Sequence, residues 1–259
     1  MLQECCYSPF FSFLDHKNKG NSDSLDRIDI IELFISVFGK EKIEALTADR
    51  EFIGDIWLQF LVKNGIKFVV RIKENNQHIS NSRGKFVKAK DLFRNLEIGK
   101  EVTIHKRKLG KNSGFLYSIS ALLNDKFELI VVVHIPDIEN PCQIYCYRWQ
   151  IETMFKAFKT SGFNMEDTHI TDSRKLETLF GIMAIAFAIS YEIGDEYEKD
   201  YPQKLKKHGY KQKSTPRIGL DLILNWMNNC KIKLVLTLKR IAKRVEKYCF
   251  DKTMVIKNV

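Results

Sequence analysis

The chain has 259 residues, of which 44% are hydrophobic and 12% aromatic, and this composition excludes a disordered or fibrous protein. Its formal net charge of +10 favours a polyanionic partner. The cysteines lack a disulfide-scaffold spacing, and the longest apolar run, residues 179–189, is too short to span a bilayer, so we expect a soluble, cytoplasmic protein with no membrane partner.

The first part of the chain alternates between helix and strand patterns. Residues 1–14 form an apolar, strand-like segment, and apolar residues then recur with a helical period over 25–38, up to Gly39. A buried strand is predicted at 43–48, followed by a helix at 55–63 and a second strand at 66–72. This order predicts an α/β domain with a parallel sheet.

The pattern changes to mostly β between residues 77 and 136. Strands are predicted at 102–108, 115–123 and 127–135, with glycine or Asn-Asp turns between them. These strands are typical of antiparallel hairpins inserted into an α/β domain. One long helix is then predicted over 139–160, and another over 173–193 that ends at Gly194.

Four segments follow from these patterns: a partial core at 1–76, the β-rich insertion at 77–136, the rest of the core at 137–195, and a basic helical region at 196–259. Seven Lys or Arg face one acid between Lys199 and Arg217, and seven more face only Glu246 between Lys231 and Lys247. The basic region therefore predicts a DNA-backbone surface. A solvated or disordered tail is the alternative.

Four side chains share one stripe of the predicted helix at 139–160. Tyr145, Arg148, Glu152 and Lys159 follow each other at steps of three, four and seven residues, and at ~100° per residue they fall within roughly 60° of arc. The stripe suits a site where the acid holds a divalent metal and the two cations hold phosphates. The alternative is a solvated helix face with an Arg148–Glu152 pair.

A second carboxylate, Asp49, directly follows the predicted strand at 43–48. Ligands bind at the carboxyl ends of strands in parallel α/β sheets. Asp49 and Glu152 could therefore meet over a metal pair with the ~4 Å separation used in phosphodiester chemistry. Asp49 could instead cap the helix that follows it.

These residues resemble a known family. Ala48-Asp49-Arg50-Glu51-Phe52, together with the stripe Tyr145, Arg148, Glu152 and Lys159, is similar to the bacterial DDE transposases of the insertion-sequence-four group. The resemblance implies a ribonuclease H-like fold: a parallel or mixed sheet flanked by helices, interrupted by the β-rich insertion and followed by the basic helical region. It also implies that Asp49 and Glu152 bind Mg²⁺ or Mn²⁺, and that Arg50, Tyr145, Arg148 and Lys159 contact DNA.

The resemblance further implies DNA transposition. Metal-activated water would cut the strand at the element boundary, and the freed 3′-hydroxyl would attack the target. The partners would be double-stranded DNA, as transposon ends and target, and a second copy in a synaptic homodimer. The protein would be nucleoid-associated in a bacterial cytoplasm.

The family's first catalytic aspartate has no counterpart in the sequence. Asp26, in Leu25-Asp26-Arg27, lies only 23 residues before Asp49 and within a helical pattern, so we interpret it as structural. We therefore expect an N-terminally truncated copy that lacks the first strands of the fold and is weakly active or inactive. The alternatives are a non-catalytic DNA-binding remnant, or a nuclease on the same scaffold with Glu51, Asp55 or Asp137 as its third acid.

Overall fold

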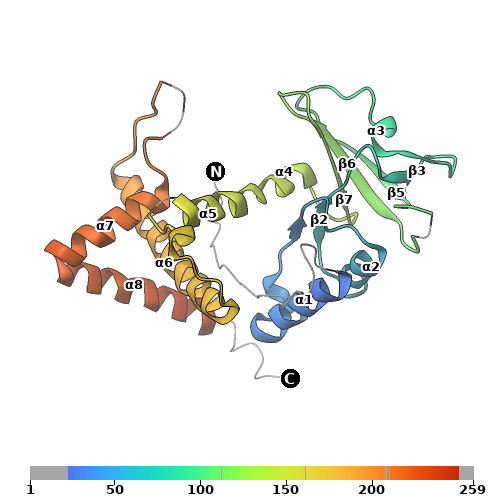
Figure 1. Ribbon diagram of the computed structural model, residues 1–259. Coiled ribbons are helices and arrows are strands. Elements are labelled where there is room, and N and C mark those ends of the chain that lie inside the picture. Colours follow the sequence, from blue (N-terminus) through green and yellow to red (C-terminus); the bar gives the residue numbers. More distant parts are fainter. Residues whose placement is uncertain (1–22, 112, 161, 208, 210, 251–259) are drawn as a thin grey trace. The chain divides into compact units, whose positions relative to one another are not determined.

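The computed structural model describes residues 23–250, except residues 112, 161, 208 and 210 (Figure 1). The strand-like pattern predicted at 1–14 lies outside the described residues. The chain divides into two units, one spanning Leu14–Ile151 and the other built on Glu152–Val259.

The first unit has an α/β composition. Its elements, in chain order, are α1 (Ser24–Phe38), the short 3-10 helix η1 (Lys40–Lys42), β1 (Leu46–Ala48), α2 (Asp55–Lys63), β2 (Phe68–Arg71), β3 (His78–Ser80), β4 (Phe86–Lys88), α3 (Ala89–Leu92), β5 (Val102–Arg107), β6 (Tyr117–Leu123), β7 (Leu129–His134) and α4 (Pro141–Cys146).

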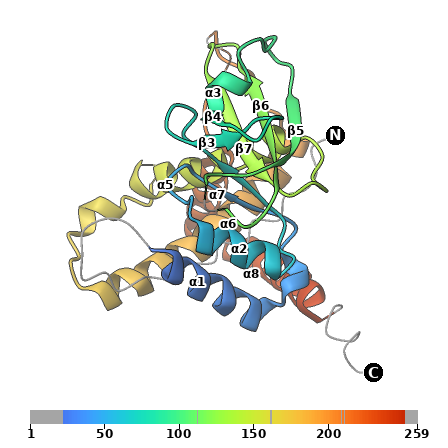
Figure 2. The same ribbon diagram turned by 90° about the vertical axis from the view of Figure 1, so that its right-hand side faces the viewer.

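Five of these strands form one mixed sheet in the order β1-β2-β7-β6-β5. β1 and β2 are parallel, with Leu46 opposite Phe68, and the other neighbours are antiparallel. β3 and β4 form a separate two-stranded hairpin, which lies near α3 in Figure 2. The predicted mixed sheet flanked by helices is confirmed. β5, β6 and β7 extend the same sheet as β1 and β2, and the segment boundaries drawn from the sequence stay a prediction.

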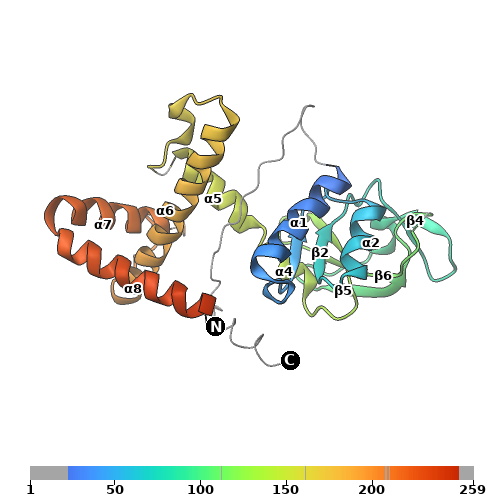
Figure 3. The ribbon, with the colours of Figure 1, turned by 90° about the horizontal axis from the view of Figure 1, so that it is seen from below.

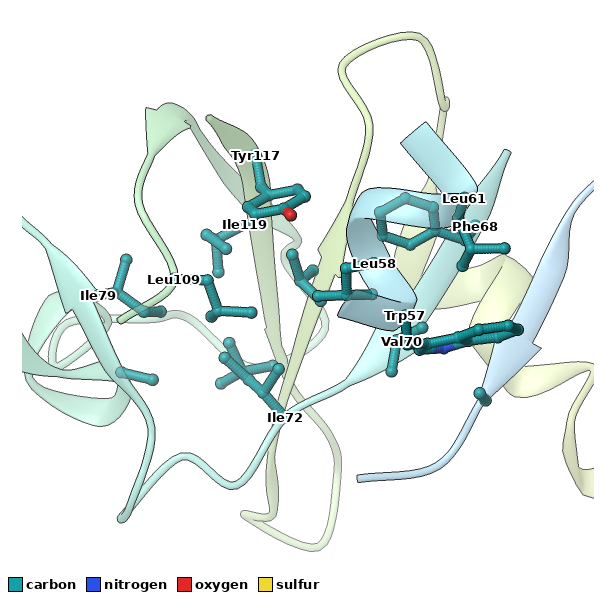
Figure 4. Close-up of a cluster of buried hydrophobic side chains, with 14 of the residues drawn as sticks. Trp57, Leu58, Leu61, Phe68, Val70, Ile72, Ile79, Leu109, Tyr117 and Ile119 are labelled. Atoms are coloured by element: carbon teal, nitrogen blue, oxygen red, sulfur yellow. The ribbon is translucent and has the colours of Figure 1, made fainter. Parts of the chain in front are cut away.

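The main core lies on the face of the sheet that α2 covers (Figure 4). Leu58 and Leu61 of α2 are fully buried there, as are Phe68 and Val70 of β2. Burying each such side chain contributes ~1.5–3 kcal/mol. α1 adds a partly buried apolar layer beside α2, and its exposed positions include apolar side chains as well as polar ones.

The opposite face of the sheet is covered by α4. Cys142 and Tyr145 of α4 are buried against Val69 of β2 and Val132 of β7. The alternation of side chains along β2 produces this arrangement, because Val69 points away from the core that holds Phe68 and Val70. The sheet therefore fixes the position of Tyr145.

The prediction of one continuous helix over 139–160 is wrong. α4 ends at Cys146, and a separate helix, α5 (Trp149–Thr160), follows. The junction uses i→i+3 bonds, since the Arg148 amide donates to the Tyr145 carbonyl and the Ile151 amide donates to the Arg148 carbonyl, both at 3.0 Å. Packing explains the break: α4 buries its apolar residues against the sheet, whereas α5 buries Ala157 and Phe158 in the core of the second unit.

The second unit is helical. After α5 it contains the 3-10 helix η2 (Met165–Thr168), α6 (Ser173–Asp200), α7 (Thr215–Asn229) and α8 (Lys231–Phe250), and Figure 3 shows α7 and α8 beside α6. Its core joins Ala157 and Phe158 of α5 to Met183, Ala184 and Phe187 of α6.

α6 does not end at Gly194 as predicted, but continues to Asp200. Gly194 and Gly219 of α7 instead allow two helix backbones to touch. A Cβ atom at Gly194 would lie 2.0 Å from the Thr215 carbonyl oxygen, and one at Gly219 would lie 1.7 Å from the Ser190 carbonyl oxygen. The glycine at 194 thus serves close packing and is not a helix stop.

Acids of the same unit neutralise part of the basic region. Arg240 and Arg244 of α8 form ion pairs with Glu196 of α6, and Arg244 also pairs with Glu192. Lys211 pairs with Glu198 at 3.0 Å. Because residues 215–250 form two helices, a disordered tail is excluded over this range, while the predicted DNA-backbone surface stays a prediction.

α6 is longer than the apolar run that the sequence shows. In the described part of the chain it is the one helix long and apolar enough to cross a membrane, over Arg174–Asp200. The core helix of a soluble protein meets the same criteria, so this is weak evidence for a membrane span. Met183 and Phe187 lie in the core of the second unit, and Glu192 and Glu196 pair with α8.

Candidate active site

Asp49 directly follows the carboxyl end of β1 and opens a tight turn. The Phe52 amide donates to the Asp49 carbonyl at 2.8 Å, and the Arg50 amide donates to the Asp49 Oδ1 at 2.7 Å. The N-cap of α2 is Gly54. Asp49 therefore does not cap the helix, which removes the structural alternative raised by the sequence.

The turn after Asp49 is anchored from two sides. The Arg27 guanidinium of α1 lies 4.6 Å from the centre of the Phe52 ring and donates to the Glu51 carbonyl at 3.3 Å. Lys73, which follows β2, forms an ion pair with the Glu51 carboxylate at 2.9 Å. These contacts hold the Asp49 turn in place and give Glu51 a structural partner.

Three of the predicted site residues converge within the first unit. The Tyr145 hydroxyl lies 3.3 Å from the Asp49 Oδ1, and the Arg148 Nε lies 3.1 Å from the same hydroxyl. The Arg148 Nη1 lies 3.9 Å from the Asp49 Oδ2. Arg148 also stands 5.6 Å from the centre of the Tyr145 ring. This triangle of Asp49, Tyr145 and Arg148 joins the two motifs found in the sequence.

The chemistry of the three groups fixes the direction of the hydrogen bonds. An arginine only donates and a carboxylate only accepts, so the Tyr145 hydroxyl accepts from Arg148 and donates to Asp49. Tyr145 is buried, with 6% of its surface exposed, whereas the Asp49 side chain is 37% exposed and the Arg148 side chain 20%. A ligand can thus reach the carboxylate and the guanidinium while the phenol stays fixed from behind.

The remaining predicted residues lie on the surface. Arg50 is exposed in the turn beside Asp49. Glu152 lies in the first turn of α5 and Lys159 in its last turn, and both are exposed. They belong to the second unit, so the predicted meeting of Asp49 with Glu152 over a shared ion stays a prediction.

The donor chemistry of the two acids suits a hard divalent cation. Mg²⁺ binds through one or two carboxylates and completes its shell with water and substrate phosphates. Within the part of the chain that the structure describes, no three His, Cys, Asp or Glu side chains group as metal ligands. Asp49 and Glu152 each offer the carboxylate oxygens that such an ion binds, and their role as ligands stays a prediction.

Asp26 has the structural role that the sequence suggested. The Asp26 carboxylate accepts from the Asp23 amide at 2.8 Å, while Asp23 accepts from the Asp26 amide at 2.9 Å, which forms the capping box of α1. Sequence patterns do not indicate the Glu51–Lys73 pair or the Arg27–Phe52 contact. Both join segments that are distant in sequence, and no local pattern encodes such pairs.

Comparison with known proteins identifies a family that matches most of the chain. The family model described as the transposase DDE domain matches residues 15–189, which is more than half of the 259 residues. No protein with a curated description matches the chain. The match covers both Asp49 and the stripe from Tyr145 to Lys159.

Proposed function

Because the chain belongs to the transposase DDE domain family, we propose that it acts in DNA transposition by cutting one strand at each element end and joining the freed 3′-hydroxyl to target DNA. Its partners in the cytoplasm are double-stranded DNA, as element ends and target, and a second copy that brings two ends together.

Asp49 and Glu152 would hold Mg²⁺ or Mn²⁺ in this function. The bound ion supplies a polarised water and neutralises charge on the phosphate. Arg148 binds a phosphate oxygen with its guanidinium, and Tyr145 holds that guanidinium and the Asp49 carboxylate in register. Arg50 and Lys159 contact the DNA backbone from their exposed positions.

One observation carries the proposal: Asp49 at a strand end meets Tyr145 of α4, which lies 96 residues later, and Arg148 of the turn between α4 and α5. A carboxylate and an arginine, joined by a buried phenol and open to solvent, can hold a cation and a phosphate side by side. A purely structural ion pair does not need the solvent access that Asp49 retains.

The 259 residues by themselves are proposed to be weakly active or inactive in strand transfer. The family's first catalytic aspartate has no counterpart in the sequence, and two-metal chemistry needs enough ligands to clamp both the attacking and the leaving oxygen. The second candidate function is DNA binding without catalysis, and the many cations of residues 196–259 favour it.

A metal-binding measurement tests whether Asp49 and Glu152 are metal ligands, and it does not depend on catalytic activity. We expect the purified chain to bind Mn²⁺, measured by electron paramagnetic resonance, and Asp49→Asn and Glu152→Gln each to weaken this binding at least about tenfold. Asp125→Asn, in the exposed turn between β6 and β7, is the matched control and should leave it unchanged. Equal Mn²⁺ affinity in the parent chain and all three variants would contradict the proposed metal site.

DNA cleavage separates the two candidate functions. Labelled supercoiled plasmid is incubated with the chain and Mn²⁺, and nicked product is measured beside DNA binding in a gel shift. DNA binding without nicking supports the non-catalytic function. Nicking that Glu152→Gln abolishes supports catalysis by these residues and overturns the expected weak activity.

A further inference from the structure

A basic groove lies in the first unit between the β3–β4 hairpin and the end of β5. It has a volume of about 340 Å³. Four cations line it, Lys106, Arg107, Lys108 and Lys111, and Asn81 and Phe86 of the hairpin region form part of its opposite wall. No carboxylate lines this groove.

The local backbone explains why successive cations gather there. β5 pairs with β6 up to Ile104, and the register then shifts before Arg107 pairs with Tyr117. Lys106 lies inside this bulge with a φ of 57°, which is the left-handed region that non-glycine residues rarely adopt. A bulge of this kind re-aims side chains, and here it interrupts the alternation that would otherwise point neighbouring lysines to opposite faces.

The walls of the groove are held together by hydrogen bonds. The Lys108 amide donates to the Ser80 hydroxyl at 2.8 Å, and the Ser80 amide donates to the Lys108 carbonyl at 3.1 Å. The Gly110 amide donates to the His78 carbonyl at 2.9 Å. The lysine backbone is therefore fixed against β3, so the charges are presented by a built surface and not by a free loop.

Among the described residues, none of the ion pairs involves Lys106, Arg107, Lys108 or Lys111. The Arg107 Nε is buried and has no hydrogen-bond partner. A buried donor without a partner is costly, and the rest of the Arg107 guanidinium belongs to a residue that lines the groove.

We propose that this groove binds phosphodiester groups of a DNA backbone as a second contact surface, apart from Asp49. The strand order places β1 and β5 at opposite edges of the sheet. Four steps of ~4.8 Å separate these edges by ~19 Å across the strands, which is about five to six base pairs of B-DNA. Because β5 runs opposite to β1, the end of β5 also lies at the other end of the strands from Asp49. This inference rests on the proposed function: the groove holds the DNA that flanks the segment bound at Asp49, and it does so independently of base sequence.

Fluorescence anisotropy with a labelled duplex of about 30 bp, in EDTA, tests this surface. We expect the triple variant K106Q/K108Q/K111Q to bind about tenfold more weakly or worse, and the slope of log affinity against log salt to fall by up to ~2.7. The control K63Q/K67Q/K126Q removes the same charge from exposed positions of the same unit and should bind within about twofold of the parent chain. K106R/K108R/K111R should retain binding, and thermal unfolding monitors the fold of each variant.

The outcomes bear on the groove alone, because EDTA removes any role for bound metal. Equal loss in the triple variant and its control, or no loss in either, overturns the proposal. The proposal is also overturned if the parent chain binds inorganic pyrophosphate in the groove but the triple variant binds duplex DNA as tightly as the parent does. That result would identify a site for small polyanions. A further outcome is that the chain shows neither plasmid nicking nor Mn²⁺ binding, while the triple variant binds DNA more weakly and its control does not. In that case only the proposed catalytic function is rejected, and the proposed groove stands.

Discussion

The hydroxyl of Tyr145 donates to the carboxylate of Asp49 at 3.3 Å, and this bond ties helix α4 to the end of strand β1. The Tyr145 ring is buried against the sheet, so its orientation is set by packing. Helix α4 and the Asp49 turn are therefore coupled through one phenol.

Replacing Tyr145 with phenylalanine should separate this bond from ring packing. The ring stays buried, while Asp49 and Arg148 lose the group that bridges them. The free energy of unfolding should fall by ~0.5–1.5 kcal/mol, measured by urea denaturation. Tyr147→Phe is the control, because that side chain is 45% exposed, and an equal loss in both variants would contradict the bridging role.

Removing Arg148 should affect metal and DNA in opposite directions. Arg148→Gln withdraws a positive charge 3.9 Å from Asp49, so without DNA the affinity for Mn²⁺ should rise by up to about tenfold. Affinity for duplex DNA should fall because a phosphate ligand is lost. Arg94→Gln, which breaks an exposed pair with Asp91, should change neither quantity. Weaker Mn²⁺ binding in Arg148→Gln would argue against competition between the two cations.

The α6–α7 crossing should not tolerate a methyl group. Gly194→Ala and Gly219→Ala would each place a Cβ atom about 2 Å or less from a backbone carbonyl oxygen, and helices must separate, at a cost of ~1–3 kcal/mol or more. Gly181→Ala, in the same helix α6, meets no atom within 4 Å and should instead stabilise the chain by ~0.5–1 kcal/mol. Thermal unfolding of the three variants measures the contrast. Stabilisation by all three would disprove the close crossing.

Stability should depend on pH through His134. Its Nδ1 lies 2.7 Å from the Ile135 carbonyl and must carry the hydrogen, so its Nε2 accepts from the Ser120 hydroxyl at 2.8 Å. Burial lowers the pKa of His134 below its usual value of 6.5, because the charged form is poorly solvated.

The sign follows from proton linkage. In the unfolded chain the His134 imidazole binds a proton near pH 6.5, whereas in the folded chain it binds that proton only at a lower pH. Stability is therefore full above that pH, and it declines as the pH falls toward the lower folded pKa by up to ~1.4 kcal/mol per pH unit. Nearby Glu101 acts oppositely at lower pH, because burial raises its pKa although hydrogen bonds from Cys142 and Ser120 lower it. Urea denaturation between about pH 5.5 and 8 should show the His134 slope. His134→Gln should remove the slope and the exposed control His78→Gln should keep it.

The sequence by itself predicted most elements of the first unit. Period-2 and period-3.6 patterns gave the helix at 55–63 and the parallel pair β1–β2 within a few residues, because these patterns record which face of each element is buried. The position of Asp49 at a strand end also followed from the local sequence pattern.

Only the tertiary structure decided the break at Tyr147 and Arg148, the passage of α6 through Gly194, and the pairing of Arg240 and Arg244 with acids of α6. The basic groove likewise depends on a bulge and on a hairpin about 25 residues earlier in the chain. The local periodicity of apolar residues shows which side of a helix or strand is buried, but it does not show which other element packs against that side. Helix ends, charge neutralisation and grooves depend on the partner that long-range packing supplies.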